Sequence, residues 1–169
     1  MTLHKLLVIL GFACLTSAFC NVLPFHMSMP VQNLNGTQDF YENILGAKVV
    51  KVTEDEISLN FYGHSLVFRV SESFVLQPSP PEPYVVEGKN YEGHGRHFGL
   101  VLEKETWQKI RNRLHETSSQ IKILAEFIKN EGTENEIGFM MILDPAGYAV
   151  ELKYLNYQWL AIRDDKKSR

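Results

Sequence analysis

Residues 143–152 read LDPAGYAVEL. Asp144 opens an Asp-Pro-Ala-Gly sequence that is typical of a tight turn, and the alternating apolar side chains after it predict a strand over residues 149–155. The apolar run at residues 139–143 predicts the antiparallel strand that enters the turn. Together these stretches predict a closing β-hairpin whose second strand carries the acidic residue Glu151.

The chain before this hairpin supplies the rest of a compact unit. Residues 97–102, HFGLVL, predict a strand that opens with His97. Apolar residues at helical spacing predict a helix over residues 105–116, and a longer strand is predicted over residues 121–128. The predicted order is therefore strand, helix, strand, strand, strand.

The first half of the chain repeats this order in a shorter form. Its predicted elements are a strand over 24–31, a helix between Asn33 and Gly46, and strands over 47–52, 57–62 and 65–70. Gly63 corresponds to Gly147 in the closing turns, and His26 corresponds to His97 at the start of the opening strands.

Internal repetition of this kind decides the fold class. Two tandem βαβββ modules, at about residues 24–70 and 96–155, are expected to form one α+β domain over residues 21–155. The polar stretch between the modules is rich in proline and is predicted to be a linker.

A duplicated unit with these motifs resembles the vicinal oxygen chelate superfamily of glyoxalases, extradiol dioxygenases and fosfomycin and bleomycin resistance proteins. The resemblance covers about residues 24–155 and is strongest at Asp39-Phe40-Tyr41, at HFGLVL and at the Asp-Pro-Ala-Gly ending with its glutamate-bearing strand. It implies that each module forms an open cup and that the cups pair into an incomplete barrel around a metal. The metal ligands are then expected on the first and last strands of the modules.

Carried onto this sequence, the resemblance implies that one divalent ion (Fe, Mn, Co or Zn) is held by His26, His97 and Glu151. The position that matches Glu151 in the first module is Val67, which cannot bind a metal. Two imidazoles and one carboxylate leave coordination positions open, as in non-haem Fe(II) oxygenases. Since glyoxalases of this superfamily use ligands from all four strands, a three-ligand site favours an extradiol-type dioxygenase.

Other polar residues are candidates for roles beside the metal. His64, at the start of the last strand of the first module, is a candidate acid–base group, and Tyr154 is a candidate for a catalytic tyrosine beside the substrate. Glu136 is placed near the mouth of the second cup, where it could contact substrate. His94 lies in the linker and is given no role.

The favoured function is a metal-dependent dioxygenase, or a glyoxalase-like lyase or isomerase, that acts on a small molecule with vicinal oxygens. One alternative is a non-catalytic small-molecule-binding protein of the resistance type. A second is a structural protein of the secretory route whose aromatic C-terminal stretch contacts a partner. The resemblance allows the barrel to close within one chain or between two, so a homodimer is one expected form.

The net charge and the N-terminal residues indicate which binding partners and which cellular location to expect for the protein. A net charge of -3 argues against nucleic acid as a partner. Lys5 and the apolar residues that follow it predict a signal peptide over residues 1–20, and hence a secreted or exported protein. If this segment is not cleaved, the alternative is a membrane-anchored protein. Residues 156–169 are expected to form a C-terminal extension.

Overall fold

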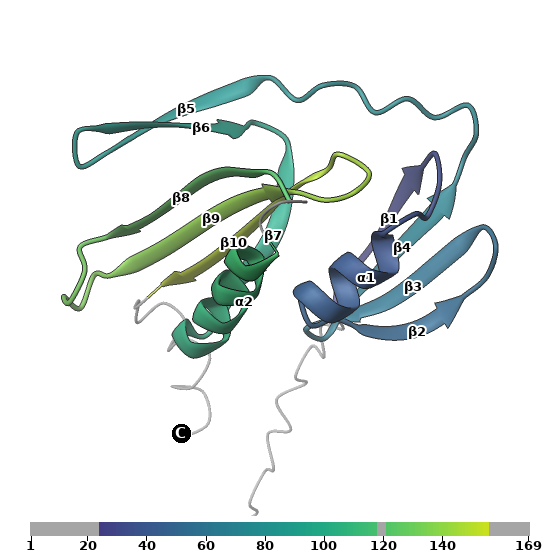
Figure 1. Ribbon diagram of the computed structural model, residues 1–169, viewed down its shortest axis with the longest axis horizontal. Coiled ribbons are helices and arrows are strands. Elements are labelled where there is room, and N and C mark those ends of the chain that lie inside the picture. The colour runs from purple at the N-terminus through teal and green to yellow at the C-terminus, as the bar shows by residue number, and fades with distance from the viewer. Residues whose placement is uncertain (1–23, 118–120, 156–169) are drawn as a thin grey trace, which may run out of the picture.

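The structure is a computed structural model that describes residues 24–117 and 121–155 (Figure 1). The predicted signal peptide at residues 1–20 and the predicted extension at residues 156–169 lie outside the described residues. Within the described part of the chain, no helix is both long and apolar enough to cross a membrane.

The order of the elements contains the predicted strand-helix-strand-strand-strand unit twice. The elements are β1 (His26–Val31), α1 (Thr37–Asp39), the π-helical turn η1 (Phe40–Ile44), β2 (Lys48–Val52), β3 (Glu56–Phe61), β4 (His64–Val70), β5 (Pro81–Val86), β6 (Lys89–His94), β7 (His97–Val101), α2 (Lys104–Glu116), β8 (Ile123–Lys129), β9 (Ile137–Leu143) and β10 (Ala149–Leu155).

The two modules have the same sheet topology. The first sheet has the strand order β1-β4-β3-β2, and the second has the corresponding order β7-β10-β9-β8. In each sheet the opening strand pairs in parallel with the last strand, and the other pairs are antiparallel. Figure 1 shows the two open sheets side by side. The predicted α+β fold of two tandem βαβββ modules with an incomplete barrel is therefore confirmed.

Helix α2 covers one face of the second sheet because its apolar residues fall on a single side. Trp107, Ile110 and Leu114 are at most 1% exposed. The indole Nε1 of Trp107 also donates a hydrogen bond to the carbonyl of Leu152 on β10, over 2.9 Å. This contact fixes the helix on the sheet and leaves the opposite face of β10 free for other side chains.

The larger of two hydrophobic clusters contains residues of both modules. Tyr41 from η1 is fully buried, and its hydroxyl donates a hydrogen bond to Asp144 Oδ2 over 2.9 Å. Asp144 Oδ1 accepts hydrogen bonds from the backbone N–H groups of Ala146 and Tyr148. Burial raises the pKa of the Asp144 carboxyl, and these hydrogen bonds oppose that shift. Asp144 thus shapes its turn as predicted and also joins the turn to the first module.

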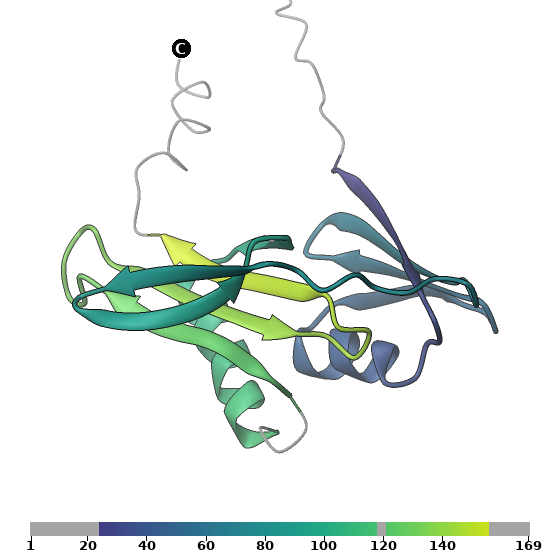
Figure 2. The same ribbon diagram turned by 90° about the horizontal axis from the view of Figure 1, so that it is seen from above.

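The segment between the modules contains a β-hairpin that the prediction of a linker missed. Strands β5 and β6 are joined by Glu87 and Gly88, whose φ angles of 49° and 77° suit a two-residue hairpin turn. In both views the hairpin lies along the second sheet, on the face opposite α2 (Figures 1 and 2). Tyr91 packs on Phe127, with ring centroids 5.0 Å apart. Prolines are tolerated in β5 because it is an edge strand.

Glu136, predicted near the mouth of the second cup, lies in a buried hydrogen-bonded network. The side chain is 5% exposed. Its Oε1 accepts hydrogen bonds from Lys104 Nζ and from the Tyr154 hydroxyl, each over 2.6 Å. Its Oε2 accepts the backbone N–H of Gly132. The carboxylate therefore fastens the β8–β9 turn and the end of β10 to the start of α2.

This network predicts a specific loss of stability in acid. The hydrogen bonds from Lys104, Tyr154 and Gly132 lower the pKa of Glu136 to about 2, from an ordinary value of 4.5. Because the folded-state pKa is the lower one, the contribution to stability is fully present above about pH 4.5 and is lost as the pH falls toward 2. In urea unfolding at a series of pH values, Glu136→Gln should lower the free energy of unfolding at neutral pH and show a weaker acid dependence than the wild type.

The control for this prediction is Glu105→Gln, at an exposed position of α2. It should follow the wild-type curve at every pH. Equal acid dependence of the wild type and Glu136→Gln between about pH 2 and 4.5 would show that Glu136 does not carry this effect.

Candidate functional site

The face of the second sheet that points away from α2 carries two of the predicted metal ligands. Side chains alternate along a strand, so His97, Gly99, Glu151 and Lys153 share this face of β7 and β10. Glu151 lies directly opposite Gly99 in the parallel register. The Nε2 atom of His97 is 3.0 Å from Glu151 Oε2. The structure thus brings a histidine and a carboxylate together across two neighbouring strands.

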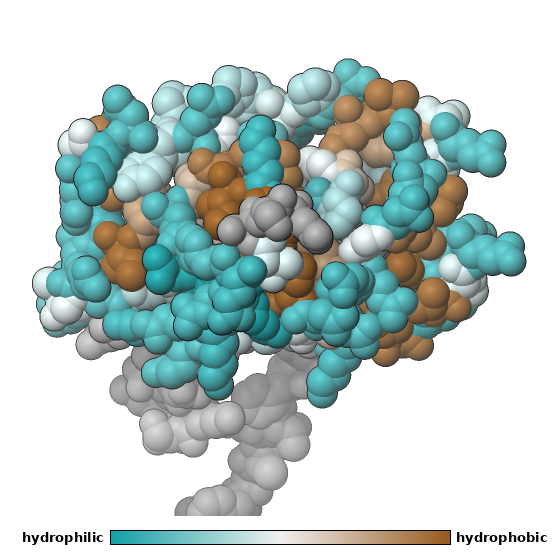
Figure 3. Space-filling model, in the orientation of Figure 1, coloured by the Kyte–Doolittle hydropathy of each residue, from teal (hydrophilic) through white to brown (hydrophobic). Residues whose placement is uncertain are grey.

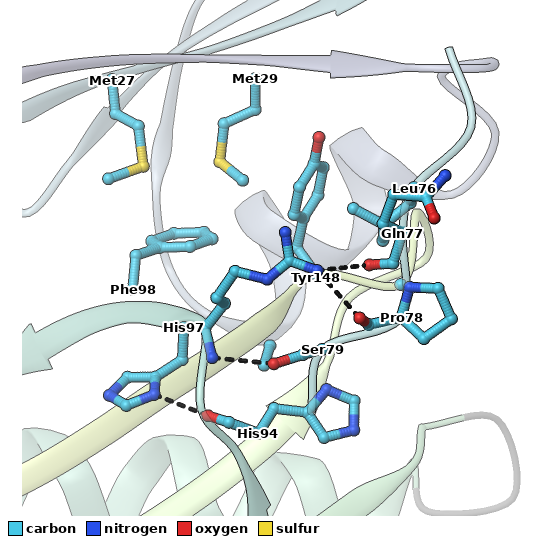
Figure 4. Close-up of a pocket in the computed structure, with 13 residues that line it drawn as sticks. Met27, Met29, Leu76, Gln77, Pro78, Ser79, His94, His97, Phe98 and Tyr148 are labelled. Carbon is cyan, nitrogen blue, oxygen red and sulfur yellow. Dashed lines mark hydrogen bonds between the residues drawn. The ribbon is translucent and has the colours of Figure 1, made fainter. Parts of the chain in front are cut away.

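The orientation of the His97 ring leaves Nε2 available as a ligand. Its Nδ1 lies 2.8 Å from the carbonyl oxygen of His94 (Figure 4). Since a carbonyl only accepts hydrogen bonds, Nδ1 carries the hydrogen and Nε2 faces Glu151. Two lone-pair groups 3.0 Å apart can share a hydrogen bond or bind one metal ion between them. Metal-binding histidines commonly donate their second ring N–H in this way, so the pair fits a divalent metal.

Lys153 completes the surroundings of the carboxylate. Glu151 is 7% exposed, and its Oε1 is 2.5 Å from Lys153 Nζ. The lysine therefore engages one carboxylate oxygen and leaves the other directed at His97. Neither Lys153 nor His94 had a predicted role. Lys153 could have been found from its spacing, because residues two apart on a strand share a face. The contribution of His94 comes from its backbone carbonyl, which side-chain chemistry does not reveal.

His26 occupies the equivalent place in the first module. It pairs with Ser65 across β1 and β4, and Ser28 pairs with Val67 as Gly99 pairs with Glu151. The predicted match of Val67 to Glu151 is therefore confirmed by the register. The ring Nδ1 of His26 is 2.9 Å from Ser65 Oγ, and the side chain is exposed.

His26 does not join the other two predicted ligands in a single chain. Among the residues that the structure describes, no three His, Cys, Asp or Glu side chains are grouped closely enough to hold a metal. The second module therefore presents two of the three predicted ligands, His97 and Glu151, while His26 remains on the open face of the first sheet.

The two candidate catalytic residues lie on the other faces of their strands. Tyr154 is three residues after Glu151, so alternation turns it toward α2, where it is 2% exposed and packs on Trp107 with ring centroids 5.0 Å apart. His64 precedes Ser65 and faces away from it. Its ring packs on Phe25, with centroids 4.4 Å apart. Neither residue shares a face with Glu151, so within one chain the structure does not bring them together with the candidate metal ligands.

A cavity of about 330 Å³ lies beside His97. Residues from both modules line it, among them Met27 of β1 and Phe98 of β7 (Figure 4). The segment before the hairpin closes one side, since Arg96 donates hydrogen bonds to the carbonyls of Gln77 and Pro78, each over 2.9 Å. His97, one of the two residues that form the candidate metal site, therefore also borders a pre-formed space.

Several solved structures share this fold. A glyoxalase/bleomycin resistance protein/dioxygenase from Alicyclobacillus acidocaldarius is 24% identical, with 83% of this chain and 96% of that chain covered at a TM-score of 0.60. A fosfomycin resistance protein from Listeria monocytogenes is 18% identical, with coverage of 76% and 89% and a TM-score of 0.55. A lactoylglutathione lyase from Agrobacterium tumefaciens is 17% identical, with coverage of 80% and 95% and a TM-score of 0.51. At these identities the likeness establishes the fold alone.

The family follows from the sequence match. No curated protein matches the chain. The family model of the Glyoxalase/Bleomycin resistance protein/Dioxygenase superfamily matches residues 24–152, which span both modules. The chain therefore belongs to the Glyoxalase/Bleomycin resistance protein/Dioxygenase superfamily.

Proposed function

We propose that the protein is a metal-dependent enzyme of the glyoxalase or dioxygenase type, and that it acts on a small molecule with two adjacent oxygen atoms. The observation that carries this proposal is the His97–Glu151 pair, whose Nε2 and Oε2 atoms lie 3.0 Å apart with Nδ1 of His97 already engaged by His94. A histidine and a carboxylate suit Mn, Fe, Co or Zn. One solved structure of the Listeria monocytogenes fosfomycin resistance protein contains Mn(II).

In this proposal the residues of the second module hold and orient the reacting groups. His97 and Glu151 would bind the ion, and a bound ion would act as a Lewis acid toward the two oxygens of the substrate. The His94 carbonyl keeps His97 in the tautomer that exposes Nε2. Lys153, which engages Glu151 Oε1, adds a positive charge that favours an anionic substrate oxygen nearby.

We further propose that the third ligand is His26 of a second copy of the chain. His26 and Ser28 are exposed on the open face of the first sheet, at positions equivalent to His97 and Gly99. Apolar side chains flank both halves of the proposed site: Phe25 is 47% exposed, and Val101 on β7 is 37% exposed. Two identical copies that exchange modules would form two equivalent sites about a two-fold axis.

The surface of the first module also suits contact with another chain. Figure 3 shows hydrophobic side chains gathered on its side of the molecule, while hydrophilic side chains cover the region over α2. Val50 and Val52 on β2 are 70% and 48% exposed. Exposed apolar side chains that gather in one region are typical of an interaction surface.

Elemental analysis of the purified protein tests the metal site. The wild type should contain about one equivalent of a divalent metal per chain, whereas Glu151→Ala and His97→Ala should bind it more than about 100-fold more weakly, because each removes a ligand. Glu116→Ala, at an exposed position at the end of α2, is the matched control and should keep the wild-type metal content.

Two outcomes would count against the proposal. Full metal content in Glu151→Ala would show that the assigned ligands are wrong. Absence of metal from every form, even after reconstitution with Mn, Fe, Co or Zn, would leave a non-catalytic small-molecule-binding protein as the better account.

A further inference from the structure

The cavity beside His97 lies between the two modules, where the edge strands β1 and β7 face each other. Its walls are mainly apolar, and they come from both modules and from the segment between them. Figure 4 shows Met27 and Met29 extending from β1 toward Phe98 and Tyr148. The apolar lining includes Met27, Met29, Leu76, Phe98, Tyr148 and Ala149.

One end of the cavity is polar and is held by hydrogen bonds. The backbone N–H of Arg96 donates to Ser79 Oγ over 2.8 Å. The backbone of His94 is fixed on both sides, since its N–H contacts Met141 Sδ and its carbonyl accepts from His97 Nδ1. Within the described residues, the imidazole of His94 makes no hydrogen bond, although it lines the cavity. The cavity therefore offers the unengaged His94 imidazole, beside the Arg96 guanidinium, in a pre-formed and mainly apolar space.

The cavity and the proposed metal site lie on different sides of the His97 ring. The cavity is bordered by His97 and by His94, which accepts the hydrogen bond from Nδ1. Glu151, which faces Nε2, is not among the residues that line it. A molecule in this cavity would contact the ring of His97 without chelating an ion held between Nε2 and Glu151.

We propose that this cavity is a second binding site, for a small aromatic molecule that carries a hydroxyl group. The site goes beyond the proposed metal chemistry and does not depend on it. Its volume of about 330 Å³ suits one or two rings, since small-molecule pockets begin at about 300 Å³ and a cavity of about 150 Å³ already holds benzene. Methionine sulfur makes favourable contacts with aromatic rings, and the His94 imidazole can bond the hydroxyl.

Binding at this place would join the two modules. Met27 and Met29 belong to the first module, whereas Phe98 and Tyr148 belong to the second. The Tyr148 hydroxyl already donates a hydrogen bond to the carbonyl of Pro30 over 2.6 Å, so the modules are in contact at the rim of the cavity. The bound ring extends this contact through apolar surface that is open in the structure.

Calorimetric titration of the chelator-treated protein with 1-naphthol tests the proposal. We expect one molecule per chain with a Kd of about 0.1 mM, and the same Kd after one equivalent of Mn(II) is added. Met27→Gln and Leu76→Gln each place an amide against the ring and should weaken binding about tenfold. Leu76 lies in the segment between the modules, so its variant remains informative if Met27→Gln is poorly folded. Val85→Gln, at a 73% exposed hairpin position outside the lining, should bind as the wild type does.

Three results would overturn the second site. Lack of binding up to about 2 mM would show that the cavity does not accept a ring of this kind. Equal affinity in the wild type, Met27→Gln and Leu76→Gln would place the naphthol elsewhere. Binding that requires Mn(II), or that is lost in Glu151→Ala, would place it at the metal. Because the titration uses metal-free protein, failure of the proposed metal site leaves this test unaffected.

Discussion

Replacement of Gly99 by alanine is expected to lower the free energy of unfolding by about 3 kcal/mol or more and to abolish metal binding. A methyl group at this position would overlap the carbonyl oxygen of Glu151 on the neighbouring strand. It would also lie 2.6 Å from the Glu151 carbonyl carbon and 2.9 Å from its Cα. All three atoms belong to the backbone, so no side-chain rotation relieves the overlap. Strand β7 must move away from β10, which separates His97 from Glu151.

The matched control is Gly95→Ala, four residues earlier in the chain. A methyl group there would meet Pro80 and Glu82 at 3.5 Å or more, which is ordinary van der Waals contact. Urea unfolding and elemental analysis of both variants measure the two effects. If Gly99→Ala were as stable as Gly95→Ala and kept its metal, the close pairing of β7 with β10 would not be what positions the site.

Much of the fold was accessible from the sequence because each module has a simple pattern. Alternating strands and the turn at Asp144 predicted the closing hairpin, and the repeat predicted the topology of both sheets. The hairpin β5–β6 was missed because its prolines normally argue against a strand. Its stability comes from Tyr84 and Tyr91, which pack on Phe139 and Phe127 of the distant strands β9 and β8. Such a tertiary contact overrides the local signal.

The site was predictable where a residue's role follows from its strand position. His97 and Glu151 met as expected because both occupy one face of paired strands. Tyr154 does not meet the pair, because it follows Glu151 by three residues and an odd separation in sequence puts two side chains on opposite faces of a strand. The separation of His26 from the pair could not be read from either module alone, because it depends on how the modules pack. That separation motivates the proposal that two chains share each site.

Mixtures of two defective chains are expected to recover metal binding if a second copy supplies His26. In a mixed dimer of His26→Ala and Glu151→Ala chains, one site combines the intact His97 and Glu151 of the first chain with the intact His26 of the other. The other site of the same dimer lacks both Glu151 and His26. Random pairing makes about half of the dimers mixed, with one complete site of two, so the mixture should hold about one quarter of the wild-type metal. Each variant alone should hold almost none.

The matched control is a mixture of His97→Ala with Glu151→Ala. Both substitutions damage the same half of the site, so no pairing of these two chains creates a complete set of ligands, and this mixture should stay empty. Elemental analysis after the chains are refolded together measures both mixtures, and light scattering verifies the dimer. Recovery only in the mixture that contains His26→Ala would establish sharing between chains. Only a site that takes His26 from the other chain predicts a difference between the two mixtures. If neither mixture recovered metal while the wild type bound it, His26 would not be a ligand contributed by the second copy.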